Sequence, residues 1–391
     1  MLSRVRPTQD SSTARQRRAL IEELSQDGYA LQHASAKFKS DKEVVLVAVT
    51  QDGRALKFAS DELKDDKEVV LAAVNQDGFI LLVASAGLQN DKDVVLEAVK
   101  QDGRALEFAS DELKGDKEVA LVAVSQDGEA LGFASDELKS DKEVVLAAVK
   151  QDGYALWSVP DELRRDKDVV LAAVKQKGDA IQIVLEYFED DKEVVLAAVK
   201  QDGLALEFAW DELKGDKEVV LAAVAQAGDA LEHASDELKD DKEVVLAAVK
   251  QDGLALWDAS AQLKSDKDVI LAAVSQNWRA LEIVVPNPLH DLIKDKEIAR
   301  LAMSKNNGAD IYIDPATLDS IIDQAKVAMA FKRGFPGETG NKEDTLKYAL
   351  RHHFNKDDEG AGVRKRPVRS ATARRISKKR ISKKSIKIKR K

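Results

Sequence analysis

Hydrophobic and polar positions repeat with a period of twenty-five residues through most of the chain. Each unit opens with Asp-Lys-Glu or Asp-Lys-Asp, continues with a run of Val, Leu and Ala, and in most copies reaches a glycine turn. Ten such units follow one another without insertion over residues 41–290. A fixed period of this size is typical of a solenoid, in which each unit buries its apolar face only against its neighbours.

The first half of each unit predicts a helix, as the copy over 141–165 illustrates. Ser140 or Asp141 is a suitable N-cap, and Ser140 with Glu143 has the spacing of a capping box. The run Val144 to Val149 is apolar on most of the helix circumference, which indicates a helix with neighbours on both sides. Gly153 is expected to end the helix in the left-handed conformation.

The second half of each unit has a different pattern, seen in the copy over 101–115. Ala105, Leu106, Ala109 and Leu113 fall on one face of a helix. Ser110 can cap a restart, so this half is either one helix or two short helices joined by a kink. The array has no strand pattern. The sequence therefore predicts an all-α fold, an α-solenoid of tandem 25-residue helix-pair repeats.

The two ends of the array differ from its middle. Residues 16–40 are expected to form a degenerate capping repeat after a disordered N-terminus over 1–15. Residues 291–360 are expected to hold an eleventh repeat, which opens at Asp295, and a helical C-terminal cap. Residues 361–391 have the composition of a disordered basic tail.

The repeat consensus reads Asp-Lys-Glu-Val-Val-Leu-Ala-Ala-Val-Lys-Gln-Asp-Gly-x-Ala-Leu-x-Phe-Ala-Ser-Asp-Glu-Leu-Lys. Over about 41–290 it resembles the repeat family called domain of unknown function 4116. The resemblance implies a repeat architecture and no established activity. No functional residues can therefore be carried over from the family.

Composition excludes some classes of protein and divides the chain by charge. There are no cysteines, so disulfides and Cys-ligated metals are excluded. No segment approaches the roughly 20 apolar residues of a membrane span. Residues 364–391 carry 15 Lys and Arg and no acid, whereas residues 1–363 have a net charge of −24. An acidic body with a basic tail indicates two separate tasks in one chain.

Catalytic signatures are absent from the sequence. It has no phosphate loop, dinucleotide fingerprint, nucleophile elbow or zinc-binding His-Glu-x-x-His helix. His352 and His353 are adjacent on an expected helix, so their side chains point about 100° apart and do not favour a shared metal. The acids at the unit openings are explained as helix caps. We therefore expect a non-enzymatic protein without catalytic residues, cofactor or metal.

Two variable positions in the second half of the repeat predict a binding surface. The residue after the turn glycine and the residue three places on share a helix face and should form a ridge along the solenoid. Aromatic and Arg side chains are frequent hot spots in interfaces. The candidate partner-binding residues are Arg54, Phe79, Arg104, Tyr154, Trp157 and Trp257.

The tryptophans of this ridge allow two interpretations. Trp157 and Trp257 occupy equivalent positions four repeats apart. Either they contact a partner, or they fill gaps between neighbouring repeats. Trp210 and Trp278 replace a Ser and a Gly, and their presence is interpreted as local repacking.

The tail contains two basic clusters separated by eleven residues. This spacing is that of a bipartite nuclear import signal, and the same charge can bind nucleic-acid phosphates. The tail has no aromatic residue, so base stacking is not expected. Ser377 and Ser382 resemble sites for basophilic kinases, and phosphorylation there would reduce the positive charge. The clusters are Arg364, Lys365 and Arg366, and then Lys378, Lys379 and Arg380.

Two functional hypotheses follow from these features. The first is an interaction scaffold that binds an unknown protein partner on the solenoid, with the tail for nuclear targeting or anion binding. The second is a nucleic-acid-associated protein that acts mainly through its tail. A tail folded back on the acidic body is a further alternative. In a eukaryotic cell we expect a nuclear or cytoplasmic location, because Pro7 and Asp10 argue against a mitochondrial presequence.

Overall fold

The computed structural model describes residues 9–284, 294–305 and 313–321. Every regular element in these ranges is helical, and none is a strand. The chain divides into two compact units, Met1–Gln324 and Ala325–Lys391, of which the second lies outside the described residues. The predicted all-α solenoid is confirmed for the described part of the chain.

Each repeat contains three helical elements in a fixed order. In the fifth repeat these are the α-helix α11 (Lys142–Gln151), the 3-10 helix η6 (Gly153–Ser158) and the one-turn helix α12 (Asp161–Arg164). The second half of the repeat is therefore two short elements, which settles the alternative that the sequence left open. The helix pair of each repeat is therefore a long helix and a second half made of two short elements.

The long helices begin the repeats. They are α1 (Gln9–Leu24), α3 (Lys42–Gln51), α5 (Lys67–Val74), α7 (Lys92–Gln101), α9 (Lys117–Gln126), α11, α13 (Lys167–Gln176), α15 (Lys192–Gln201), α17 (Lys217–Gln226), α19 (Lys242–Gln251), α20 (Lys267–Gln276) and α22 (Lys296–Lys305).

The 3-10 helices follow the long helices. They are η1 (Gly28–His33), η2 (Gly53–Phe58), η3 (Gly78–Val83), η4 (Gly103–Phe108), η5 (Gly128–Phe133), η6, η7 (Gly178–Ile183), η8 (Gly203–Phe208), η9 (Gly228–His233), η10 (Gly253–Asp258) and η12 (Trp278–Ala280).

A one-turn helix closes each repeat. These helices are α2 (Ala36–Lys39), α4 (Asp61–Lys64), α6 (Ala86–Gln89), α8 (Asp111–Lys114), α10 (Asp136–Lys139), α12, α14 (Leu185–Phe188), α16 (Asp211–Lys214) and α18 (Asp236–Lys239), with the 3-10 turn η11 (Leu263–Ser265) in the ninth repeat. In the tenth repeat α21 (Leu281–Val284) directly continues η12, and the residues at the closing position lie outside the described ranges.

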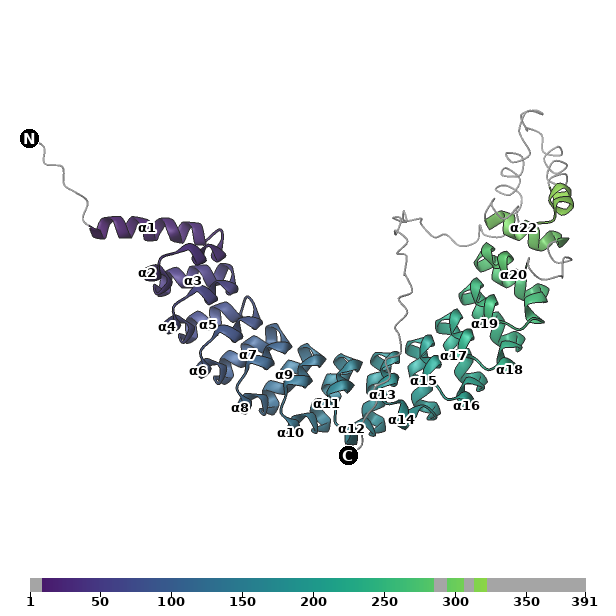
Figure 1. Ribbon diagram of the computed structural model, residues 1–391, viewed down its shortest axis with the longest axis horizontal. Helices are drawn as coiled ribbons and strands as arrows, with labels where there is room; N and C mark the ends of the chain where they lie inside the picture. Colours follow the sequence, from purple (N-terminus) through teal and green to yellow (C-terminus); the bar gives the residue numbers. More distant parts are fainter. Residues whose placement is uncertain (1–8, 285–293, 306–312, 322–391) are drawn as a thin grey trace, which may run out of the picture. The chain divides into compact units, whose positions relative to one another are not determined.

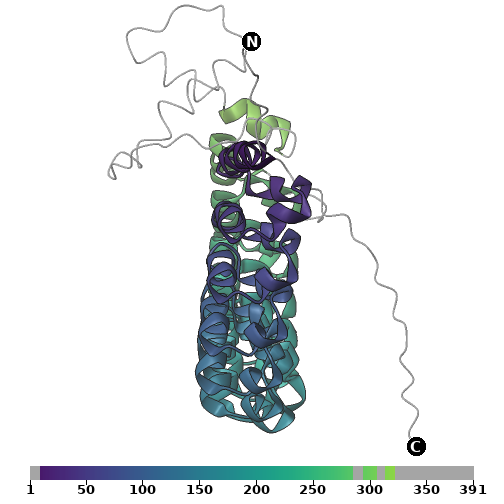
Figure 2. The same cartoon turned by 90° about the vertical axis from the view of Figure 1, so that its left-hand side faces the viewer.

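Successive repeats stack element on element. Each long helix contacts the next long helix, and each 3-10 helix contacts the next 3-10 helix. The repeats consequently form one row (Figure 1). In the turned view, the long helices occupy one column and the shorter helical elements a second column beside it (Figure 2).

The long helices begin at an aspartate cap. The side chain of Asp141 accepts hydrogen bonds from the backbone N–H of Glu143 at 2.9 Å and of Val144 at 3.3 Å. Ser140 instead ends the preceding one-turn helix, α10. The predicted capping box of Ser140 and Glu143 is therefore wrong, because Ser140 is the C-cap of α10 and the next residue, Asp141, is the N-cap of α11.

The core lies between the long helices and the 3-10 helices. Val144, Val145, Ala148 and Val149 are fully buried, and Leu156 of η6 covers them from the other layer. Leu146, by contrast, is half-buried. The long helix is therefore less enclosed than its apolar circumference predicts, because one of its faces is open to solvent.

The turn glycine is required for close packing rather than for its backbone conformation. Helix α11 ends at Gln151, and its C-cap Asp152 has an extended backbone with φ −141° and ψ 117°. Gly153 does not have the left-handed φ that the sequence predicted. A Cβ atom at Gly153 would lie 2.7 Å from the carbonyl oxygen of Ala173 in the next long helix. The residue thus lets two repeats approach each other.

The degenerate capping repeat is more complete than predicted. Helix α1 begins at Gln9, so residues 9–15 are helical and not disordered as expected. Helix α1 is followed by η1 and α2, which gives this degenerate copy the full set of three elements.

At the other end of the array, Asp295 caps the long helix of the predicted eleventh repeat through the N–H of Glu297 at 2.8 Å. Residues 315–321 are helical and belong to the expected C-terminal cap. The rest of that cap, the basic tail and both candidate phosphorylation sites lie outside the described residues.

Candidate partner-binding surface

The 3-10 helices place two variable side chains of each repeat on one outward face. In η6 the carboxylate of Asp152 accepts a hydrogen bond from the N–H of Tyr154 at 2.9 Å and so begins the helix. Ala155 and Leu156 point into the core and are buried. Because a 3-10 helix has three residues per turn, Tyr154 and Trp157 lie one above the other on the opposite side. We call these two columns of side chains the outer ridge.

Glutamine side chains fix successive 3-10 helices relative to each other. The Gln151 amide donates to the carbonyl oxygen of Gln126 at 3.2 Å and accepts from the N–H of Gly128 at 2.6 Å. The Gln151 side chain therefore provides hydrogen-bond partners for a carbonyl group and an N–H group of the preceding turn. Equivalent contacts to the preceding turn are made by Gln126, Gln176, Gln201, Gln226, Gln251 and Gln276.

Trp157 and Trp257 are the most prominent side chains of the outer ridge. They are 63% and 57% exposed, so they lie at the surface rather than in gaps between repeats. Two leucines of the same columns, Leu82 and Leu204, are 58% and 42% exposed. These leucines were not recognised as candidates, because a leucine in an apolar repeat has no sequence signal of exposure.

The two arginines of the ridge contact neighbouring side chains. Arg54 forms an ion pair with Asp52 at 2.9 Å, and its guanidinium carbon lies 5.9 Å from the ring centroid of Tyr29. Arg104 stacks similarly on Phe79, at 5.8 Å from the ring centroid. Both therefore make cation–π contacts with the preceding repeat, in addition to any contact with a partner.

Tyr154 also links two repeats. Its hydroxyl donates a hydrogen bond to the carboxylate of Asp179, and the Nζ of Lys177 lies 3.9 Å from its ring centroid. The hydrogen bond to Asp179, together with partial burial, raises the pKa of Tyr154 to about 12. The phenol is consequently protonated at neutral pH and holds η6 against η7.

Trp210 differs from its predicted role. It takes the N-cap position of α16 without a side-chain cap hydrogen bond, and it is 50% exposed. The interpretation as local repacking is therefore wrong for this residue. Its ring lies on the one-turn helix, outside the two columns of the outer ridge. Trp278, in contrast, is half-buried.

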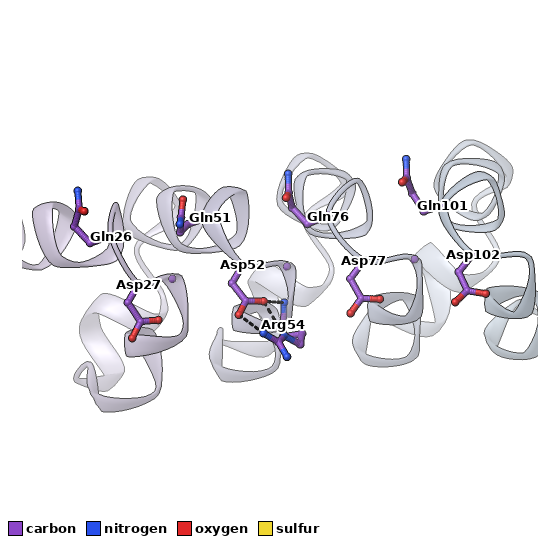
Figure 3. Close-up of a pocket in the computed structure, with 12 residues that line it drawn as sticks. Gln26, Asp27, Gln51, Asp52, Arg54, Gln76, Asp77, Gln101 and Asp102 are labelled. Atoms are coloured by element: carbon purple, nitrogen blue, oxygen red, sulfur yellow. Dashed lines mark hydrogen bonds and ion pairs between the residues drawn. The ribbon is translucent and has the colours of Figure 1, made fainter. Parts of the chain in front are cut away.

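A polar groove of about 580 Å³ runs along the turns of the degenerate capping repeat and of the first three repeats. Figure 3 shows one glutamine and one aspartate from each turn in two parallel rows, with Arg54 paired to Asp52. The carboxylates of Asp52, Asp77 and Asp102 each accept the N–H of the residue two places on, at 3.0 Å. The aspartates are thus caps of their 3-10 helices, which explains them without a ligand.

A row of inter-repeat ion pairs follows the starts of the long helices. Lys142 Nζ lies 2.7 Å from Asp166 and 3.0 Å from Asp168 of the next repeat. The same arrangement recurs from Arg17 to Lys267, and we call it the ion-pair ladder. Hydrogen bonding to these acids raises the pKa of Lys142, and Lys142 lowers the pKa of Asp166.

These acids were predicted to be helix caps alone, and the ladder was not predicted. A lysine in the second position of each of the ten openings was the signal that could have revealed it. Arg17 has this role in the degenerate capping repeat, so that repeat is joined to the array like the others.

Metal sites and membrane-spanning helices are both absent from the described ranges. There, no three or more His, Cys, Asp or Glu side chains are grouped so that they could hold a metal ion. Among the same residues, no helix has the length and apolar character needed to cross a membrane.

The stacked helices and the continuous inter-repeat contacts define the class of protein, a helical repeat solenoid. The chain belongs to the family described as domain of unknown function 4116, whose profile matches residues 24–64, 66–114, 116–164, 141–189, 191–239 and 241–284. Most of these matches begin at an opening aspartate and span two repeats. Searches of curated proteins and of solved structures found no match.

Proposed function

We propose that this solenoid is a non-enzymatic interaction scaffold that binds a partner protein on its outer ridge. The exposure of Trp157 and Trp257 at equivalent positions carries the proposal. An exposed tryptophan presents a large apolar surface to water, and tryptophan is enriched among interface hot spots. Among the remaining ridge candidates, Tyr154 lies on the same 3-10 helix as Trp157, whereas Arg54, Phe79 and Arg104 belong to the first three repeats and would extend the surface toward the start of the array.

The spacing of the apolar ridge residues limits the shape of the partner. Trp157, Leu204 and Trp257 belong to the fifth, seventh and ninth repeats. Packed helices are roughly 8–10 Å apart, so consecutive members of this set are roughly 16–20 Å apart. A partner that covers all three must extend over about 30–40 Å, which favours an elongated segment over a compact loop.

The outer ridge can be tested with tryptophan variants. Partner proteins that the full-length chain captures should no longer be captured by the Trp157→Ser and Trp257→Ser variants. With a purified partner, each substitution should lower the affinity about 30-fold, which corresponds to a hot spot of about 2 kcal/mol. Trp210→Ser is the matched control, because it removes an equally exposed tryptophan outside the ridge. Equal retention of every captured protein by all three variants would contradict the proposal.

For the tail we propose localisation or anion binding. The 15 basic residues over 364–391, with no acid among them, support this proposal. Nuclear targeting requires an import receptor, whereas binding of nucleic acid requires the phosphates and is strongly salt-dependent. The replacements Ser377→Glu and Ser382→Glu should weaken salt-sensitive binding, because each adds a negative charge to the tail.

Removal of the tail distinguishes the two functions. A chain that ends at Gly362 should lose nuclear accumulation as a fluorescent fusion too large to diffuse through nuclear pores, but it should keep its ridge partner. If truncation abolishes all binding, the nucleic-acid-associated alternative holds instead. If the distributions of the two fusions are identical, the tail has no role in import.

A further inference from the structure

The outward face of the long helices has a second apolar surface, separate from the outer ridge. Leu171 on α13 and Leu196 on α15 are half-buried, and Ala197 lies beside Leu196. Between these helices is a groove of about 410 Å³, lined by Leu171, Lys175, Glu193, Leu196, Ala197, Lys200 and Gln201. The same half-buried leucine recurs on the neighbouring helices, for example Leu146 on α11. We call the surface across α11, α13 and α15 the leucine groove.

One edge of the leucine groove is positively charged. Lys150, Lys175 and Lys200 occupy equivalent positions near the ends of α11, α13 and α15, and all three are exposed. None of the three forms an ion pair with the described residues. No other run of three consecutive repeats has lysine at this position, since the equivalent residues are Thr50, Asn75, Lys100, Ser125, Ala225, Lys250 and Ser275.

The opposite edge of the groove is already neutralised. Its acids belong to the ion-pair ladder, in which Glu193 lies 2.8 Å from Lys167. The apolar floor is also interrupted in the third repeat, where Glu97 replaces the usual alanine and pairs with Lys100 at 3.4 Å. Within the described residues, a run of three unpaired lysines beside an uninterrupted apolar floor therefore occurs in repeats five to seven alone.

The spacing of the groove matches that of an α-helix laid across it. Neighbouring long helices are roughly 8–10 Å apart, and seven residues of an α-helix rise about 10.5 Å. A helix with an apolar residue in every heptad would therefore place one apolar side chain over each leucine position. Acidic residues on one flank of that helix would face the three lysines. Across three long helices, the contact would occupy about 14–20 residues of the ligand helix.

We propose that the leucine groove binds an amphipathic α-helix of a partner protein, with an acidic flank over Lys150, Lys175 and Lys200. The apolar heptad positions of the ligand helix contribute affinity. The three lysines determine which side of the ligand helix carries its acidic residues. The observations that carry this inference lie on the long-helix layer, so it does not depend on the outer ridge.

The test uses the full-length chain and two synthetic helical peptides of about 20 residues. Both have leucine at heptad positions; one has glutamate along one flank and the other has lysine there. In fluorescence anisotropy, the glutamate peptide should bind and Lys175→Glu should weaken it at least tenfold. The triple replacement Lys150→Glu, Lys175→Glu and Lys200→Glu should reverse the preference in favour of the lysine peptide.

Lys250→Glu is the matched control, because Lys250 has the same position and exposure but no neighbouring lysine in the adjacent repeats. It should change the affinity less than twofold. Leu171→Ser with Leu196→Ser should weaken binding of the glutamate peptide, while the melting curve shows whether the array remains folded. A glutamate peptide of the same composition with scrambled order should not bind.

Three outcomes would overturn the proposal. Equal affinity for the ordered and scrambled peptides would show charge attraction alone. Binding that is unaffected by Lys175→Glu would place the acidic peptide elsewhere on the chain, for example on the basic tail. A dimer that excludes the peptide and dissociates with Lys175→Glu would show that a second copy of this chain occupies the groove.

Discussion

Lys167 Nζ lies 2.8 Å from the Oδ2 atom of Asp191, the residue that begins the next long helix. The other oxygen of the same carboxylate accepts the backbone N–H of Glu193 at 3.0 Å and of Val194 at 3.1 Å. One aspartate therefore caps its own helix and binds the lysine of the preceding repeat. Because the relationship recurs along the array, local helix initiation and the register between repeats depend on the same side chain.

Two substitutions of Asp191 should separate these roles. Asp191→Asn keeps a good N-cap but removes the charge, whereas Asp191→Ala removes both. We expect Asp191→Ala to lower the free energy of unfolding by about 1 kcal/mol more than Asp191→Asn. Urea denaturation measures the difference. In a double-mutant cycle, Lys167→Met should cost less in the Asp191→Asn background than in the wild type, and the cost that remains there reports the ion pair of Lys167 with Glu193. Equal losses for Asn and Ala would mean that the cap contributes nothing.

The ion-pair ladder should also determine how stability depends on pH. Lysine contacts lower the pKa of Asp166 and Asp216 below the ordinary value of 3.8. Their contribution is therefore present above pH 3.8 and is lost as the pH falls through the lower folded-state pKa. The pKa of Lys142 is raised above 10.5, so its contribution is present below pH 10.5 and is lost as the pH rises through the raised value.

We consequently expect the melting temperature to be nearly constant between about pH 5 and pH 9 and to fall in stronger acid. Circular dichroism at a series of pH values measures this. The chain with Asp166→Asn and Asp216→Asn should have a shallower acid transition than the wild type. An identical acid transition would assign the loss of stability to other carboxylates.

Gly153 and Gly215 should respond in opposite directions to alanine. A Cβ atom at Gly153 would lie 2.7 Å from the carbonyl oxygen of Ala173, so alanine must push two repeats apart. Overpacking of this kind usually costs about 1–3 kcal/mol. At Gly215 the nearest atom would be 3.5 Å away, and the backbone has φ −93°. There alanine should be neutral or stabilise by up to about 1 kcal/mol, because it restricts the unfolded chain. Denaturant midpoints of both variants test the prediction, and a tolerated Gly153→Ala would refute the close-approach explanation.

Val145 and Leu146 are adjacent, but the structure predicts different responses to a charge. Val145 is fully buried, whereas Leu146 is half-buried on the open face of α11. Val145→Asp should therefore disrupt stacking around the fifth repeat, with a loss that exceeds about 4 kcal/mol for an unpaired buried charge. Leu146→Asp should lower the melting temperature far less. Similar losses for the two variants would indicate that Leu146 is enclosed as well.

The periodic pattern was sufficient to predict the helices, the repeat boundaries and the solenoid, because each of these depends on contacts within about fifty residues. The role of Gly153 could not be deduced in the same way. A glycine after a helix is compatible with a left-handed turn and with a close approach, and the choice depends on where Ala173 of the next repeat lies. The capping box at Ser140 failed because the preceding one-turn helix already uses that residue.

The candidate surface was predictable in part. The eclipsed geometry of a 3-10 helix brings Tyr154 and Trp157 into adjoining columns, as their spacing of three indicated. Their exposure was not predictable, because a tryptophan in an apolar repeat can equally fill a gap between helices. Lys142 appeared to be an ordinary surface residue, since its partners Asp166 and Asp168 are more than twenty residues away. The leucine groove was hidden for a similar reason, because half-burial of Leu171 depends on the packing of its neighbours.

Asp258 should destabilise the ninth repeat at neutral pH. It is half-buried at a position that is Phe in several repeats, such as Phe108 and Phe208. Burial is the main cause that raises its pKa above 3.8; Glu232 and Asp229 add to the shift, and Lys239 and Lys264 oppose it. A carboxyl whose pKa is raised on folding favours the protonated form, so its penalty is present above the folded pKa and disappears as the pH falls below it.

Asp258→Asn should therefore raise the melting temperature at pH 7, and its advantage over the wild type should shrink as the pH is lowered toward 3.8. The ion-pair ladder weakens over part of the same range, but it does so equally in both chains and cancels in the difference. Glu232→Gln serves as the second variant, because the negative charge of Glu232 helps to raise the pKa of Asp258. In a Glu232→Gln background, the stability gain from Asp258→Asn should therefore disappear at a lower pH. An advantage that is constant with pH would mean that the asparagine acts through packing, and that the charge of Asp258 is fully solvated beside Trp257.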